Sequence, residues 1–160
     1  MTALPYLRKK IPSSLVDRRV WTALSECSSL RLPHVVATYE TPDEFVVVCD
    51  FVPGDTLHER KARRLPFRGG AHCADVCEAV EELHRRGIAH RDISPRNVLV
   101  AADGAHLIDL GIARPLERSP SESPHFDPRL AAPEQYGFAP VDERTDVCVR
   151  WSFAGLYACA

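Results

Sequence analysis

Apolar and polar residues follow two periodicities along the chain, and each predicts a different kind of element. Residues 6–11 and 45–49 are short runs rich in aliphatic and aromatic side chains, which is typical of β-strands. All five residues of 45–49 are apolar, which indicates a strand buried on both faces. Residues 15–28 and 70–86 instead repeat apolar side chains about every 3.6 positions, so we predict two amphipathic helices there.

The ends of both predicted helices carry recognisable signals. Ser13 and Ser14 precede the first helix, and a serine hydroxyl at that position can accept a hydrogen bond from a backbone N–H of the first turn. Gly87 follows the second helix, where a left-handed residue commonly ends a helix.

Two further apolar runs surround an Asp-Gly pair and predict a β-hairpin. The runs are residues 98–100 and 106–108, with the Asp-Gly pair at 103–104. Asp-Gly flanked by β-forming residues is a strong signal for a two-residue turn. With the turn centred on that pair, counting back along both strands places Val98 opposite Asp109.

This predicted pairing brings Asn97 close to Asp109, although twelve positions separate them in the sequence. Directly opposed residues of an antiparallel pair lie about 5 Å apart. An amide oxygen and a carboxylate are hard ligands that suit Mg²⁺, which usually takes one or two protein ligands and leaves its other positions to phosphates and water. Asp92, in a Pro-containing loop five residues before Asn97, is expected near the same point.

Three motifs in this order resemble those of protein kinases. His90-Arg91-Asp92 with Asn97 is similar to the catalytic loop, Asp109-Leu110-Gly111 to the metal-binding triplet, and 132–134 (Ala-Pro-Glu) to the end of the activation segment. The triplet at 132–134 followed by Gln resembles bacterial Ser/Thr kinases in particular.

The resemblance implies an α+β, two-lobed, kinase-like fold in one incomplete domain. It places a partial N-lobe in residues 1–51 and a partial C-lobe, with the catalytic loop and activation segment, in residues 52–160. No Gly precedes Gly54, so the glycine-rich loop over the phosphates is expected to be missing. After Val147 the similarity to the central C-lobe helix fades. We therefore expect the C-lobe to stop just after that helix begins.

The resemblance also implies a function, which is ATP- and Mg²⁺-dependent phosphoryl transfer to a hydroxyl of a protein substrate. Asp92 would orient that hydroxyl or accept its proton, while Asn97 and Asp109 would hold the metal. Arg91 is the residue that grips a phosphate on the activation segment in many kinases. Asp146 would accept hydrogen bonds from the catalytic-loop backbone.

The same resemblance places the nucleotide. Lys9 would contact the phosphates, with Lys10 as the alternative. The backbones of Asp50 and Val52 would meet the adenine, Cys49 would take the gatekeeper position, and Leu99 and Asp109 would complete the nucleotide contacts.

The sequence departs from the kinase pattern in the first predicted helix. That helix normally supplies a Glu that pairs with the phosphate-binding lysine, but the expected positions here hold Val20 or Trp21. Ser94 also stands where Ser/Thr kinases usually place a Lys that touches the transferred phosphate. The lysine–glutamate pair is therefore not expected, and the identity of the acceptor residue stays open.

Residues 114–130 are expected to be the activation segment. They are rich in Pro and Ser, which predicts a loop, and Ser119, Ser121 and Ser123 are candidate phosphorylation sites.

A basic cluster stands out near the start of the predicted C-lobe. It consists of Arg60, Lys61, Arg63, Arg64 and Arg68. No aromatic residue lies between Arg60 and Arg64 to stack on nucleic-acid bases. We interpret the cluster as a solvated helix face and its connector.

Composition limits the class of protein. The 160 residues are 45% hydrophobic and 26% charged, which suits one globular domain. The net charge of −2 gives no overall attraction for nucleic acid or an anionic membrane. Residues 1–14 lack the apolar stretch of a signal peptide, no apolar run is long enough to span a bilayer, and the six cysteines form no C-x-x-C pair. A cytoplasmic protein with free thiols is expected.

Other functions remain open at this point. A pseudokinase that binds ATP or scaffolds a partner is favoured by the missing glycine-rich loop and helix Glu. It is opposed by the complete set of Asp92, Asn97 and Asp109. A non-functional gene remnant is the third interpretation. A small-molecule kinase ranks low because it usually has His-Gly-Asp instead of His90-Arg91-Asp92. Besides a protein substrate, we expect a partner that covers an exposed C-lobe face.

Overall fold

The computed structural model describes residues 5–66, 68–116 and 145–146. Within them the strands form two three-stranded sheets and one two-stranded pair. Neighbouring strands run antiparallel in all three.

The first sheet contains β1 (Tyr6–Pro12), β2 (Val35–Glu40) and β3 (Glu44–Asp50) in the order β1-β3-β2. The central position of β3 explains its unbroken apolar sequence, because Phe45, Val46 and Val47 are each at most 5% exposed. Both predicted strands are therefore confirmed, and the buried one is the middle strand.

Helix α1 (Arg18–Ser25) is shorter than the predicted range of 15–28, and the predicted caps Ser13 and Ser14 are wrong. The side chain of Asp17 caps the helix by accepting a hydrogen bond from the N–H of Arg19 at 3.0 Å. Residues 13–15 form a turn in which the N–H of Leu15 donates to Pro12. Leu15 and Val16 still pack against the core, so the apolar repeat extends beyond the helix that it predicts.

The second sheet contains β4 (Asp55–Thr56), β6 (Val98–Ala101) and β7 (Gly104–Leu107) in the order β4-β6-β7. Helix α2 (Leu57–Ala62) directly follows β4, and β5 (Ile88–Ala89) pairs with β8 (Arg114–Pro115).

Helix α3 (Gly69–Arg85) matches the predicted helix to within one residue at each end. Its apolar stripe is buried, since Val76, Ala79, Val80 and Leu83 are at most 3% exposed. Gly87 has a φ of +69°, as expected of a residue just past a helix end. No helix in the described part of the chain is long and apolar enough to cross a membrane.

The predicted register of the β6–β7 hairpin is wrong by two positions. Ala101 pairs with Gly104, and Val98 pairs with Leu107 rather than with Asp109. Ala102 and Asp103 therefore form the turn, while Gly104 has a φ of +135° and begins the second strand. The Asp-Gly pair marks the right turn, but its Gly supplies the unusual backbone angle one position later than the simple count assumes.

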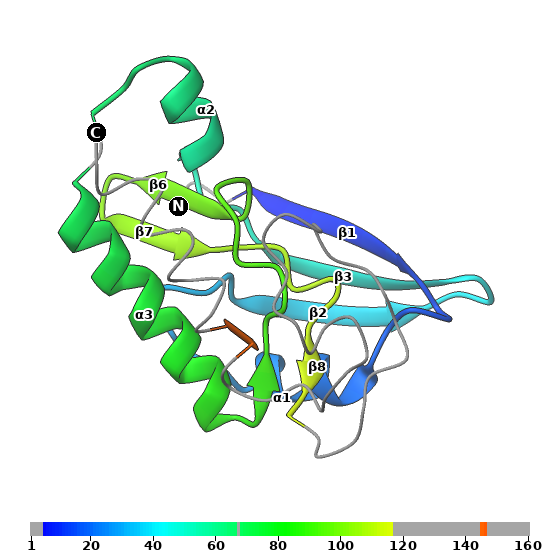
Figure 1. Cartoon of the computed structure of the whole chain (residues 1–160). Helices are drawn as coiled ribbons and strands as arrows, with labels where there is room; N and C mark the ends of the chain where they lie inside the picture. The colour runs from blue at the N-terminus through cyan, green and yellow to red at the C-terminus, as the bar shows by residue number, and fades with distance from the viewer. Residues whose placement is uncertain (1–4, 67, 117–144, 147–160) are drawn as a thin grey trace.

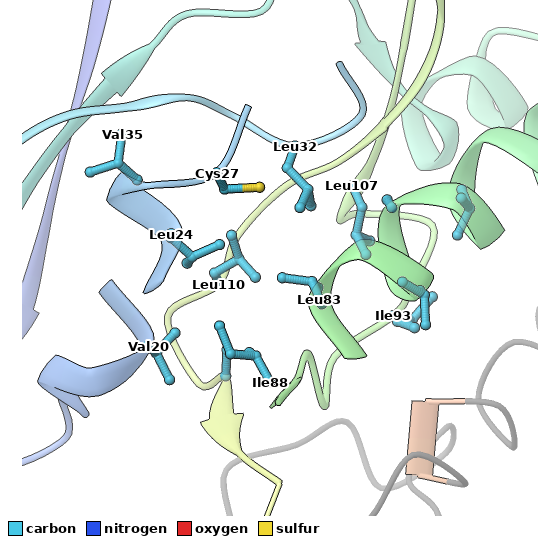
Figure 2. Close-up of a cluster of buried hydrophobic side chains, with 14 of the residues drawn as sticks. Val20, Leu24, Cys27, Leu32, Val35, Leu83, Ile88, Ile93, Leu107 and Leu110 are labelled. Carbon is cyan, nitrogen blue, oxygen red and sulfur yellow. The ribbon is translucent and has the colours of Figure 1, made fainter. Parts of the chain in front are cut away.

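One apolar core connects the first sheet and its helix with α3. Figure 1 shows α3 running along one side of the β6–β7 hairpin, with α1 below the strands β2 and β3. Figure 2 shows Leu110 lying between Val20 and Leu24 of α1 and Leu83 of α3. Leu110 is 4% exposed, and Leu24 and Leu83 are at most 1% exposed. The residue that follows Asp109 is therefore anchored in the core, which fixes the backbone of Asp109 itself.

Gly54, just before β4, is a point of close backbone approach to β6 in the second sheet. A Cβ atom built on Gly54 would lie 2.5 Å from the carbonyl oxygen of Val100, whereas one built on Gly70 would meet nothing within 4 Å. We predict that Gly54→Ala lowers the free energy of unfolding by about 1–3 kcal/mol through overpacking. The matched change Gly70→Ala is expected to raise it by up to about 1 kcal/mol, because alanine is favoured within a helix. Chemical denaturation checks both, and equal stability of the two variants would contradict the close approach.

Candidate functional site

A cavity of about 200 Å³ brings together residues from distant parts of the sequence. Its walls come from β1, α1, residues 33–35 at the start of β2, β3, the segment 50–52, β6 and the segment 108–110. All five residues predicted from the sequence to contact nucleotide line it: Lys9, Asp50, Val52, Leu99 and Asp109. Cys49, expected at the gatekeeper position, lines it as well, and burial raises the pKa of its thiol.

The wall is mostly apolar, and its charged members include Lys9 and Asp109. Leu7, Val35, Val47 and Leu99 contribute aliphatic surface. A cavity with apolar walls and a few polar groups is typical of a small-molecule site, in which the polar groups fix the orientation of the ligand.

The side chain of Lys9 forms an ion pair with Asp109, which joins β1 to the segment after β7. Lys10 instead points to Glu44, with 2.5 Å between Nζ and a carboxylate oxygen. Of the two lysines left open by the sequence, Lys9 is therefore the one in the cavity. Its role toward a phosphate remains a prediction.

Trp21 is, with Val20, one of the two α1 residues at the positions where the resemblance places the glutamate of a kinase. It is 6% exposed, lines the cavity, and has its ring centroid 6.4 Å from that of Phe45. The expectation that α1 offers no carboxylate to Lys9 agrees with this arrangement. The apolar ring packs against the sheet while Lys9 takes its counter-charge from Asp109.

Several contacts hold the carboxylate of Asp109 in its ionised form. Burial by itself would raise the pKa of Asp109, but the hydrogen bond and the charge of Lys9, with the N–H of Gly111 at 3.1 Å, hold it below the usual value. A Cβ on Gly111 would lie 2.7 Å from Nζ of Lys9. Glycine at position 111 therefore leaves room for the ion pair.

Asp92 and Asn97 meet within the loop between β5 and β6. The amide nitrogen of Asn97 donates to the Asp92 carbonyl at 2.9 Å and to an Asp92 carboxylate oxygen at 2.7 Å. The N–H of Ile108 donates to the carbonyl of Asn97 at 2.8 Å, so Asn97 lies beside the residue that precedes Asp109. The loop and the segment after the hairpin thus bring Asp92 and Asn97 close to the backbone that precedes Asp109, even though the register of the hairpin differs from the prediction.

The ring of His90 connects the same loop to that segment. The N–H of Asp92 donates to Nδ1 of His90 at 3.2 Å, so in the neutral ring the proton is on Nε2. Nε2 lies 3.1 Å from the carbonyl oxygen of Ile108 and donates to it. His90, which is fully buried, therefore links Asp92 to the backbone just before Asp109.

A buried carboxylate fixes the start of the loop. Asp146, which is 0% exposed, accepts hydrogen bonds from the backbone N–H groups of His90 and Arg91, both at 2.8 Å. These contacts confirm the expectation for Asp146. They also hold Arg91 at a φ of +70°, a left-handed conformation that costs roughly 1–2 kcal/mol in an L-residue.

His84 is a site residue that sequence reasoning missed. Its Nε2 lies 2.9 Å from the same Asp146 carboxylate, and it stands in the last turn of α3. A polar residue on the helix turn that leads into the catalytic loop was the available signal. The helical repeat of α3 predicts only its buried apolar residues and not the partners of its polar ones.

Arg91 lies below the surface, at 2% exposed, near Arg114 of β8. Burial lowers the pKa of its guanidinium, the positive charge of Arg114 lowers it further, and Asp146 opposes the shift. Arg114 donates to the carbonyl of Leu15 at 2.8 Å. The candidate phosphorylation sites Ser119, Ser121 and Ser123 and the triplet at 132–134 lie outside the described residues.

The oxygen atoms available near the cavity are suitable ligands for a divalent cation such as Mg²⁺. Asn97 uses its amide nitrogen toward Asp92, which leaves its oxygen as the ligand atom, and Asp109 supplies an ionised carboxylate. Among the described residues, no group of three or more His, Cys, Asp and Glu side chains forms a metal site. A site with two protein ligands agrees with the usual coordination of Mg²⁺, in which water and phosphate oxygens occupy the remaining positions.

Comparison with known proteins agrees with the geometry. The family model described as the protein kinase domain matches residues 4–158. A probable serine/threonine-protein kinase of Streptomyces coelicolor is 32% identical over 136 residues, which are 75% of this chain and 20% of that protein. The serine/threonine-protein kinase PknB of Mycobacterium tuberculosis is 30% identical over 136 residues, or 75% of this chain and 22% of that protein. The chain thus spans about a fifth of the length of these relatives.

Removing the Asp146 charge tests how the loop is held. We predict that Asp146→Asn lowers the free energy of unfolding by about 3–5 kcal/mol, since the amide group cannot satisfy the buried donors around it as the carboxylate does. The control is Asp103→Asn, which affects an exposed carboxylate paired with His106 and is expected to change stability far less. Urea unfolding of both variants checks this, and a similar small loss in each would contradict a buried anchor at Asp146.

Removing the Lys9 charge tests the electrostatics of the cavity. Without it, burial is the largest remaining influence, so the pKa of Asp109 in Lys9→Met should rise above its usual value. In the parent chain the lowered pKa gives a stability contribution that is present above the unfolded-state pKa and lost on acidification. The stability deficit of Lys9→Met should therefore be largest near neutral pH and shrink as the pH falls through the range in which aspartates titrate.

NMR titration of the Asp109 carboxyl carbon and melting curves at several pH values make this measurement. Lys10→Met is the matched control, because Lys10 pairs with Glu44 and should leave the titration of Asp109 unchanged. A shift of the same size in both variants would mean that Lys9 is not the counter-charge of Asp109.

Proposed function

This chain belongs to the protein kinase family, and from that premise we propose that it binds ATP with Mg²⁺ and transfers a phosphoryl group to a protein hydroxyl. The observation that carries the proposal is the cavity in which Lys9 and Asp109 meet beside the other predicted nucleotide contacts. Serine and threonine are the proposed acceptors, by similarity to the bacterial relatives. A cytoplasmic setting, where ATP is abundant, is part of the same proposal.

The apolar part of the cavity is the proposed binding site of the adenine ring. The segment 50–52, expected to contact the adenine through its backbone, lies at one wall, and Leu99 and Val35 provide aliphatic surface. The phosphates would then extend toward Lys9 and Asp109 at the charged end.

Lys9 and Asp109 neutralise each other until nucleotide arrives. A phosphate group is the natural competitor for the ammonium of Lys9, and a divalent cation is the natural competitor for the carboxylate of Asp109. Binding of metal and nucleotide together would exchange one ion pair for two favourable contacts. Magnesium, when bound, supplies charge neutralisation at the phosphates.

Asp92 is the proposed group that orients the acceptor hydroxyl. Its carboxylate accepts a hydrogen bond from Asn97, and its backbone N–H is held by His90. A carboxylate whose position is fixed by two neighbours is suited to align a hydroxyl or to accept its proton as the new bond forms. Arg91 and Arg114 are proposed to receive a phosphate on the activation segment, which would relieve the repulsion between their charges.

A second function is favoured by one specific observation. The α1 positions expected to carry the glutamate hold Val20 or Trp21, and Lys9 pairs with Asp109, the proposed metal ligand. A pseudokinase, which binds nucleotide or a partner protein without efficient transfer, fits such a site. Nucleotide binding is common to both functions, so phosphoryl transfer separates them. A partner that covers a C-lobe face remains a prediction under either.

Two carboxylate variants test the division of roles. We predict that Asp109→Asn abolishes Mg²⁺-dependent binding of a fluorescent ATP analogue, because it removes the charge that neutralises the cation. Without Mg²⁺, the same variant should bind the analogue at least as well as the parent chain, since Lys9 has lost its competing partner. Asp92→Asn should leave nucleotide binding nearly unchanged and abolish transfer to protein.

Titrations of the analogue with and without Mg²⁺, followed by transfer of labelled phosphate to a generic protein substrate, make the comparison. An equal loss of nucleotide binding in both variants would overturn the assigned roles. Binding without any transfer by the parent chain would select the pseudokinase.

A further inference from the structure

A strongly basic surface lies on α2 and the residues that follow it. We call it the α2 basic surface and define it as Arg60, Lys61, Arg63, Arg64 and Arg68. The range 57–68 contains these five cations and a single acidic residue, Glu59, in a chain whose net charge is −2. Residues 57–68 are therefore strongly positive, whereas the chain as a whole has a slightly negative net charge.

This surface is fixed to the catalytic loop. The N–H of His58 donates to the carbonyl of Pro95 at 2.8 Å, and Pro95 lies between Asp92 and Asn97. Thr56, just before α2, pairs with Leu99 of β6, and Leu57 is 1% exposed. In Figure 1, α2 stands out from the end of the β4–β6–β7 sheet. The basic surface thus has a set position next to the loop that carries Asp92.

The acidic residues nearby are engaged in holding the helix. Glu59 accepts a hydrogen bond from the backbone N–H of Thr56 at 2.8 Å as part of a capping box. Asp55 pairs with Arg63 at 2.8 Å and with Arg60 at 4.0 Å. Most of the cations nevertheless face solvent, since Lys61, Arg63, Arg64 and Arg68 are all exposed.

Arg64 stands where stability alone would favour another residue. It lies just past the end of α2 with a φ of +55°, a left-handed angle that suits glycine. An arginine at this position carries a backbone cost and adds a charge to the surface. Exchanging it for glycine would remove the charge and relieve the backbone at the same time.

We propose that the α2 basic surface binds an acidic segment of the protein substrate, close to the hydroxyl that Asp92 orients. This inference rests on the proposed function and specifies its substrate class. The path from His58 to Arg64 along the helix is about 9 Å, at 1.5 Å per residue. Each residue of an extended peptide covers about 3.3 Å. Acidic side chains roughly three or more residues from the acceptor hydroxyl therefore reach the surface.

A peptide fits this surface better than nucleic acid does. No aromatic residue lies between Arg60 and Arg64 to stack on bases, and the net charge of −2 gives the chain no overall attraction for a long polyanion. Exposed charges act over about 8 Å at physiological salt. A few carboxylates on a short peptide segment are therefore enough to pair with the exposed cations of the α2 basic surface.

Binding can be measured apart from catalysis. The probes are a fluorescein-labelled peptide with one serine flanked by glutamates and the same peptide with glutamines, each titrated with the full chain by fluorescence anisotropy. We expect the glutamate peptide to bind more tightly, and the difference to disappear at high salt. Arg64→Gly should weaken binding of the glutamate peptide about two- to fivefold, and Arg64→Gly with Arg68→Gln about tenfold, while the melting temperature of Arg64→Gly stays level or rises.

Arg85→Ala is the matched control. Arg85 is an exposed cation at the far end of α3, about 24 Å along the helix from Gly69, and it pairs with Glu82. Its removal should not change binding of either peptide. Equal binding of the glutamate and glutamine peptides, or an equal loss in Arg64→Gly and Arg85→Ala, would overturn the inference. So would an equally tight complex with a single-stranded RNA oligonucleotide of the same charge.

The two proposals fail in different ways. If the glutamate peptide binds through Arg64 but neither peptide is phosphorylated with Mg²⁺ and ATP, the basic surface stands and the catalytic proposal falls. If both peptides are phosphorylated equally well and Arg64→Gly changes nothing, the catalytic proposal stands and the acidic-substrate inference falls.

Discussion

The buried carboxylate of Asp146 is the constraint on which the arrangement of the site depends. A charge with no exposure to water must be satisfied inside the protein, and here two backbone N–H groups and the ring of His84 satisfy it. Those contacts fix the turn at His90 and Arg91. The ring of His90 then carries the constraint to the carbonyl of Ile108, one residue before Asp109. A single path of hydrogen bonds thus leads from the buried anchor to the charged end of the cavity.

At that end, the protein balances two charges with each other. Lys9 and Asp109 come from opposite sides of the cavity, and each is the counter-charge of the other. On the α1 side, Val20 and Trp21 stand at the positions expected for a competing carboxylate, and both are buried apolar residues. In the proposed function, phosphate would offer a partner to Lys9 and a divalent cation a partner to Asp109. The efficiency of the proposed transfer would then depend on how readily the ion pair opens.

The sequence predicted the elements well because their signals are local. The apolar run of β3 and the helical repeat of α3 each report burial directly, and the motif around Asp92, Asn97 and Asp109 identifies the residues that meet. The hairpin register and the start of α1 were less predictable. A turn can shift by one residue when the following Gly takes the unusual angle, and apolar residues of a preceding turn can extend a helical pattern. The contacts of His84 were the hardest to predict: its polar side chain in the last turn of α3 was a signal, but its partner is a carboxylate 62 positions away.

The central claim is that nucleotide and metal replace the Lys9–Asp109 pair within the cavity. A crystal structure with a non-hydrolysable ATP analogue and Mn²⁺, which is located by its anomalous scattering, tests it most directly. We expect an Mn²⁺ peak bound by Asp109 and Asn97, with Nζ of Lys9 moved to a phosphate and the adenine against Val35 and Leu99. An intact Lys9–Asp109 pair with the nucleotide bound elsewhere, or a metal held by other residues, would contradict it.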